Sequence, residues 1–323
     1  MSANIVLGSR FLGLQKLLLS ASGLNSLLLK NIPDSAYFSP DAIVTCLATL
    51  HALKDLEITF HSPRSRPIRE SRNPPPPTRI PLPALTKLIF QGVSEYLEDL
   101  VAQIDTPQLH ALSITFFHQL FFHAPQLLRF ISRAPKLKGR DEARVVFTHY
   151  SARVTFGLPS WPDQDIRVEI SCKHPDLQLL SLVQLCTSSF PQTFIPTVKH
   201  LYMLESREYQ DDMWGMDSED WENNIQNSQL LQLLQPFIAV KNFYISEKIL
   251  PLIAPALQEL VGVRITEALP ALECLFLDGL RVSGTVREAI RPFLAARQLS
   301  THPIVASYWD SEDDDWYEGD GCE

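Results

Sequence analysis

A short pattern of apolar residues recurs along this chain and constrains its fold more than any other feature. In each copy an apolar residue is followed by a second three positions later and by a third two positions after that. Strand side chains alternate between faces, so the last two residues of each copy point to one face of a short strand. The pattern therefore predicts seven short strands: Leu24-Leu27-Leu29, Leu53-Leu56-Ile58, Leu85-Leu88-Phe90, Leu109-Leu112-Ile114, Val198-Leu201-Met203, Val240-Phe243-Ile245 and Leu272-Leu275-Leu277.

Helical patterns lie between these apolar triplets. Ser39-Pro40 places a cap residue and a first-turn proline before the first of them, Ile43, Leu47 and Leu50. Similar stripes occur near residues 97–104, 127–131, 179–183, 230–238 and 286–294. Strands that alternate with helices favour parallel pairing. We therefore predict an α/β fold, an irregular leucine-rich repeat solenoid with a curved parallel sheet and helices on its convex face.

The repeats are uneven in length and in detail. The last strand residues of the first four copies are 29, 32 and 24 positions apart. A regular repeat places Asn or Cys eight positions after its first leucine. Here that position holds other residues, so the asparagine ladder is absent: Ile32, His61, Val93, Phe117, Ser206, Lys248 and Leu280. Less regular strands are expected near residues 144–147, 153–156 and 167–172.

We assign the predicted solenoid to residues 1–305. Two inserts interrupt it, and an acidic tail follows it. The insert at 62–81 has seven prolines and several arginines, which is typical of an extended, polyproline-like segment. It is either a structural loop or a peptide ligand, and its arginines contact an acidic partner or the acidic insert at 205–227. We expect the acidic tail, 306–323, to be poorly ordered.

Charge and composition exclude several classes of function. The net charge is -9, but the acidic insert and tail together hold 16 of the 37 acidic residues and only one basic residue, so the remaining body has 27 basic and 21 acidic residues. This balance does not indicate a nucleic-acid partner. The five cysteines form no CxxC pair, which favours the cytoplasm or nucleus. No apolar stretch is long enough to predict a membrane span.

The sequence has no recognisable catalytic signature. Only 12 glycines occur, and the common hydrolase, metalloprotease and nucleotide-binding motifs are missing. We therefore expect no enzyme activity, no cofactor and no metal. An enzyme with an unrecognised site is an alternative.

Exposed residues next to the apolar strand positions are the candidates for contact with a protein partner. Two tryptophans of the acidic insert are added to them, and these either anchor a partner or pack the insert onto the body. The candidates are Lys54, Glu57, Lys87, His110, Lys199, His200, Tyr202, Trp214 and Trp221.

Nearly the whole chain resembles the leucine-rich repeat region of fungal (basidiomycete) F-box-type proteins. The residues that carry this resemblance include RNPPPPTR at 72–79, Tyr96 to Leu100, Cys186 to Ser189 and Ile253 to Val261. The resemblance implies a repeat region that holds substrates for a cullin-RING ubiquitin ligase. Residues 1–30 contain no F-box pattern, so adaptor binding would require an F-box upstream. The expected functions are a free-standing interaction scaffold or such a substrate receptor.

Overall fold

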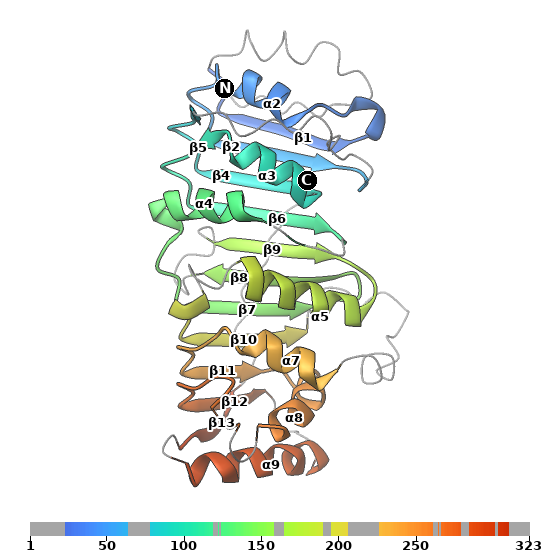
Figure 1. The fold of residues 1–323 in the computed structure, drawn as a ribbon, viewed down its shortest axis with the longest axis vertical. Coiled ribbons are helices and arrows are strands. Elements are labelled where there is room, and N and C mark those ends of the chain that lie inside the picture. The colour runs from blue at the N-terminus through green and yellow to red at the C-terminus, as the bar shows by residue number, and fades with distance from the viewer. Residues whose placement is uncertain are drawn as a thin grey trace.

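A long β-sheet runs along the whole length of this protein, as the computed structural model shows (Figure 1). The structure describes residues 23–63, 78–118, 122, 124–157, 165–189, 195–205, 226–260, 264, 266–278, 284–300 and 303–309. Within them, eleven strands join in one sheet in the order β1-β2-β4-β6-β9-β8-β7-β10-β11-β12-β13. Their bounds are β1 Ser26–Ile32, β2 Asp55–Phe60, β4 Lys87–Gly92, β6 Ala111–Phe117, β7 Glu142–Phe147, β8 Ser151–Gly157, β9 Ile166–Ser171, β10 His200–Glu205, β11 Asn242–Ile245, β12 Cys274–Asp278 and β13 Val305–Trp309. A two-stranded sheet pairs β3 (Ile80–Pro81) with β5 (Ile104–Asp105).

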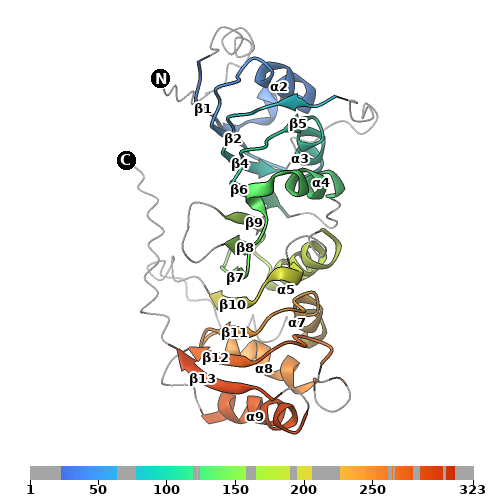
Figure 2. The ribbon, with the colours of Figure 1, turned by 90° about the vertical axis from the view of Figure 1, so that its left-hand side faces the viewer.

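The helices lie on one side of the sheet. They are α2 Pro40–Leu47, α3 Ser94–Val101, α4 Pro125–Arg133, α5 Pro175–Gln184, α7 Asn227–Leu234, α8 Leu250–Gln258 and α9 Gly284–Gln298. The column of strands bows toward the helices, so the opposite face of the sheet is concave (Figure 2). These features confirm the predicted α/β solenoid with helices on the convex face. No helix among the described residues is both long and apolar enough to cross a membrane.

All seven apolar triplets lie in one hydrophobic core. Each of their residues is at most 4% exposed, and the second and third residue of every triplet belong to a strand. Ser39 caps α2 as expected, because its hydroxyl oxygen accepts a hydrogen bond from the Ala42 N–H at 3.3 Å. The repeated spacing therefore predicted both the strands and the face that each strand buries.

Strand β8 departs from the predicted parallel pairing. It runs antiparallel to both β7 and β9, whereas the other neighbours in the sheet are parallel. Only Thr148, His149 and Tyr150 separate β7 from β8, and a parallel connection needs about a dozen residues or more. The Thr148 hydroxyl oxygen closes this turn by accepting the Ser151 N–H at 2.9 Å. The short turn therefore imposes a hairpin within a solenoid.

Main-chain carbonyls link successive repeats where the strands begin. The Lys54 carbonyl accepts hydrogen bonds from Thr86 N–H (2.8 Å) and Lys87 N–H (3.0 Å). The Lys199 carbonyl accepts Lys241 N–H (2.8 Å) and Asn242 N–H (3.0 Å) in the same way. Four more carbonyls accept two N–H groups of the next repeat at equivalent places: Asn25, Thr86, Asp141 and Lys241. Backbone groups thus satisfy one another between repeats, without the asparagine side chains that regular repeats use.

The C-terminal boundary and two helices differ from the prediction. Strand β13 extends to Trp309, so residues 306–309, which we had assigned to the tail, belong to the sheet. Helix α7 ends at Leu234, which leaves Ile238 outside the buried stripe and 53% exposed. Helix α8 was not predicted, because its apolar residues are almost continuous around two prolines and show no helical spacing. Most of the proline-rich insert (64–77), most of the acidic insert (206–225) and residues 310–323 lie outside the described residues.

An aromatic cluster near the N-terminal end of the core makes the stability of the folded protein fall at alkaline pH. Tyr96 is fully buried against Phe60 and Tyr37, and neither tyrosine hydroxyl has a hydrogen-bond partner among the described residues. Burial, followed by the charges of Asp99 and Asp41, raises the pKa of Tyr37 to about 12. Burial also raises the pKa of Tyr96.

The raised pKa of Tyr37 predicts how stability changes with pH. The folded state favours the neutral phenol, so this contribution is complete below pH about 10 and is lost as the pH rises toward about 12. Chemical denaturation across this range should show a smaller loss of stability in Tyr37→Phe than in the wild type. Equal losses in the two proteins would contradict the prediction.

Candidate functional site

The structure divides the candidate residues between two places. Glu57, His200 and Tyr202 lie on strands with their side chains on the concave face, and Glu57 forms an ion pair with Lys30 at 3.2 Å. A second group lies where the parallel strands begin, which we call the strand-start side (at the left in Figure 1). This group is Lys54, His110 and Lys199, which precede their strands, and Lys87, the first residue of β4, whose side chain is on the same concave face as Ile89. Trp214 and Trp221 lie outside the described residues.

A single row of side chains crosses the concave face from β1 to β13. Strand pairing aligns each member with the next, and the row alternates with the buried triplet residues along each strand. Its character changes along the sheet, from mixed aliphatic and polar residues to aromatic ones. The row is Leu28, Glu57, Ile89, Ser113, Arg167, Thr155, Arg144, Tyr202, Tyr244, Phe276 and Ser307.

Three neighbouring members of the row stack their rings. The centroids of Tyr202 and Tyr244 are 4.3 Å apart, and those of Tyr244 and Phe276 are 4.4 Å apart, with 8° between the planes in both pairs. Trp309, on β13, meets Tyr244 edge-on at 5.4 Å and Tyr202 at 6.0 Å. We call Tyr202, Tyr244, Phe276 and Trp309 the aromatic strip. All four are only partly buried, so the strip forms part of the concave surface.

Polar side chains border the aromatic strip. The Arg144 guanidinium lies over the Tyr202 ring at 5.2 Å, and its Nε donates to Glu142 Oε1 at 2.6 Å. His200 Nδ1 lies 3.1 Å from Asn242 Nδ2 on the next strand. The strip therefore offers flat apolar surface beside a fixed cation and hydrogen-bonding groups, a combination that is common at protein interfaces.

Sequence reasoning found Tyr202 but missed the rest of the strip. Tyr244 and Phe276 occupy the same place as Tyr202, between the second and third residues of a triplet. Considering the position between the second and third residues of every triplet would have identified both Tyr244 and Phe276. Trp309 carried no such signal, because β13 has no triplet of its own.

The buried thiols have the opposite of the properties that a catalytic nucleophile needs. Burial raises the pKa of Cys46 and Cys172, and it raises that of Cys186 to about 12. An activated cysteine instead has a lowered pKa, because the thiolate is the reactive form. Within the described residues, no group of three or more His, Cys, Asp or Glu side chains is placed to hold a metal ion.

Thiol labelling should separate the cysteines by burial. In a Cys322→Ser variant, we expect a water-soluble thiol reagent to modify Cys274, which is only partly buried, well before Cys186. Cys186 should react only as fast as the protein unfolds. Mass spectrometry of timed samples would identify the modified peptides, and rapid labelling of Cys186 under native conditions would contradict its burial.

Comparison with known proteins finds a likeness among solved structures but none among sequences. No family model matches the chain, and no curated protein sequence matches it. Among solved structures, it is similar to the leucine-rich repeat-containing protein LegL7 from Legionella pneumophila, with 11% identity and a TM-score of 0.34. That alignment covers 97% of this chain and 91% of the other. A likeness this low carries no argument about function, and the leucine-rich-repeat-like solenoid is established by the strand order, the registers and the buried triplets.

Proposed function

We propose that this protein is a non-catalytic scaffold that binds a protein partner on its concave face. The observation that carries the proposal is the aromatic strip, in which four ring side chains from four consecutive strands of the sheet share one exposed surface. Tyrosine and tryptophan are the residues most often found at energetic centres of protein interfaces.

The strip also has the rigidity that recognition favours. Its three stacked rings are held at strand spacing by the registered pairing of β10 with β11 and of β11 with β12, and the Trp309 ring meets two of them edge-on. Stacked rings have few conformations to lose on binding, which lowers the entropic cost of association. Because the helices cover the other side of the sheet, the concave face is the one on which a partner meets this many strands at once (Figure 2).

Cross-linking of the full-length protein in its native cell extract tests this proposal. Partners captured by the wild type should be lost from the double variant Tyr202→Ala/Tyr244→Ala. The matched control is Tyr150→Ala, since Tyr150 is 51% exposed but lies on the β7–β8 turn. For a purified partner, we expect the double variant to bind at least about tenfold more weakly. Equal capture by all three proteins would refute a binding role for the strip.

A narrower form of the proposal makes the chain a substrate receptor of a cullin-RING ubiquitin ligase. It is supported by the resemblance to F-box-type proteins alone. The genomic sequence upstream of Met1 tests it directly: an in-frame F-box supports this role, and a stop codon preceded by a promoter opposes it.

A further inference from the structure

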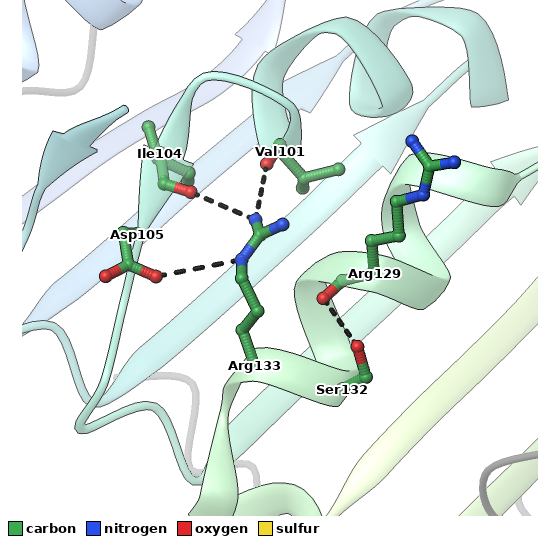
Figure 3. Close-up of polar contacts among 6 residues, drawn as sticks. All are labelled: Val101, Ile104, Asp105, Arg129, Ser132 and Arg133. Carbon is green, nitrogen blue, oxygen red and sulfur yellow. Dashed lines mark hydrogen bonds and ion pairs between the residues drawn. The ribbon is translucent and has the colours of Figure 1, made fainter. Parts of the chain in front are cut away.

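Arg133, at the end of α4, is fixed against the preceding repeat (Figure 3). Its Nη2 donates to the carbonyl oxygens of Val101 and Ile104, both at 3.4 Å, and its Nε lies 3.7 Å from Asp105 Oδ1. The side chain is nevertheless 25% exposed. Arg133 therefore holds a positive charge in a fixed position at the surface.

Two more arginines lie close to Arg133. Arg129 is exposed one helical turn earlier on α4, so its guanidinium is on the same side of the helix (Figure 3). Arg79 is exposed directly before β3, and the next residue, Ile80, pairs with Ile104, whose carbonyl Arg133 binds. We call Arg79, Arg129 and Arg133 the arginine cluster.

The cluster carries more positive charge than its surroundings neutralise. Burial and the charge of Arg79 lower the pKa of Arg133, Asp105 opposes this, and Arg129 lowers it further. The basic surface continues past α4, because residues 125–140 include five basic side chains and no acid, and Lys136 and Lys138 among them are exposed. An anionic ligand would relieve the repulsion among these like charges.

We propose that the arginine cluster binds an acidic segment of a partner protein. Guanidinium groups present paired N–H donors that match the two oxygens of a carboxylate. Three guanidiniums, of which that of Arg133 forms an ion pair with Asp105, suit a short run of Asp or Glu. This surface is separate from the aromatic strip, because α4 lies on the helical side of the sheet and the strip on the other (Figure 2).

The acidic segments of the chain itself are poorly placed to fill this surface. Residues 206–225 follow β10, which is four strand spacings or about 19 Å from β6. This lateral distance alone takes up more than half of the roughly 33 Å that about ten residues, the length of each limb, can span. Residues 310–323 start after β13, seven spacings or about 34 Å from β6, and must also round the sheet. Only the last few of these 14 residues come within reach.

A nucleic acid fits the cluster less well than an acidic peptide. Nucleic-acid binding needs a basic surface that follows many phosphates, and the body of this chain has only a modest excess of 27 basic over 21 acidic residues. The three guanidiniums of the arginine cluster match a few acidic side chains instead.

Fluorescence anisotropy with the full-length protein tests the proposal. The probe is a labelled peptide of about a dozen residues in which Asp and Glu alternate with Ser, measured at about 50 mM salt and above. We expect saturable binding that weakens with salt, and a Kd raised about tenfold or more in Arg79→Glu/Arg129→Glu. Arg291→Glu is the matched control, because Arg291 is also exposed on an outer helix, α9, and its Kd should stay within about twofold of the wild type. Arg129→Gln checks the cluster without adding a negative charge, and circular dichroism confirms that each variant is folded.

Three results would overturn this assignment. The first is an absence of saturable binding, or equal weakening by the cluster and control variants. The second is tighter binding of a single-stranded oligonucleotide than of the peptide. The third is tighter peptide binding when the acids of 310–323 are changed to Asn and Gln, which would make the chain's own tail the occupant. None of these results bears on the aromatic strip, which is tested by separate variants.

Discussion

Replacing Phe243 by alanine should lower the free energy of unfolding by about 3–5 kcal/mol. Phe243 is the middle residue of its triplet and is fully buried in β11, between the registered Leu201 of β10 and Leu275 of β12. Alanine would leave a cavity in the middle of the stacked core, where the fixed strand spacing limits collapse. Urea denaturation followed by circular dichroism measures the change.

The neighbouring substitution Tyr244→Ala is the control for this prediction. Tyr244 is on the same strand but the opposite face, where it stacks with Tyr202 and Phe276. Its loss removes partly exposed ring contacts, so we expect a cost of about 1–2 kcal/mol. Equal losses from the two substitutions would contradict the division of β11 into a core face and an exposed concave face.

Replacing Glu98 by alanine should cost about 2–4 kcal/mol, because it removes two charge-assisted hydrogen bonds. Glu98 is on α3, yet its carboxylate caps the next helix: Oε1 accepts the Leu127 N–H at 2.8 Å and Oε2 accepts the Gln126 N–H at 2.9 Å. Pro125 begins α4 and has no N–H, so Glu98 binds the first two N–H groups of that helix. The side chain is 8% exposed, and water cannot readily replace it.

Two further variants isolate the cap of α4. Glu98→Gln keeps one acceptor oxygen and should lose about half as much stability as Glu98→Ala. Glu288→Ala removes an exposed glutamate from α9 and should change stability by less than about 0.5 kcal/mol. Denaturation curves in which Glu98→Ala matches Glu288→Ala would show that the cap contributes little.

The strands were predictable from sequence because burial imposes a repeated spacing on every rung. Leu88 and Phe90, for example, occupy positions that must be apolar, since both side chains face the core. The order of the central strands was not predictable, because the direction of β8 depends on the three-residue turn at Thr148 to Tyr150 rather than on any apolar pattern.

The candidate binding surface was only partly predictable for a related reason. Exposed positions tolerate many residue types, so Lys54 and Tyr202 looked equally plausible as candidates. The structure distinguishes them, because Lys54 precedes its strand and Tyr202 lies within a stack.

The capping of α4 by Glu98 and the hydrogen bonds of Arg133 join residues 28–32 positions apart, and no local pattern indicates such pairs.

The backbone carbonyls that link successive repeats where the strands begin affect the order in which the repeats unfold. At six places the carbonyl of one repeat accepts two N–H groups of the next, so a repeat between two such links cannot open without releasing a neighbour on either side. A terminal rung such as β13 has only one neighbour to release. Hydrogen exchange should therefore start at the two ends and advance inward one repeat at a time, with the β7–β8 hairpin among the last segments to exchange.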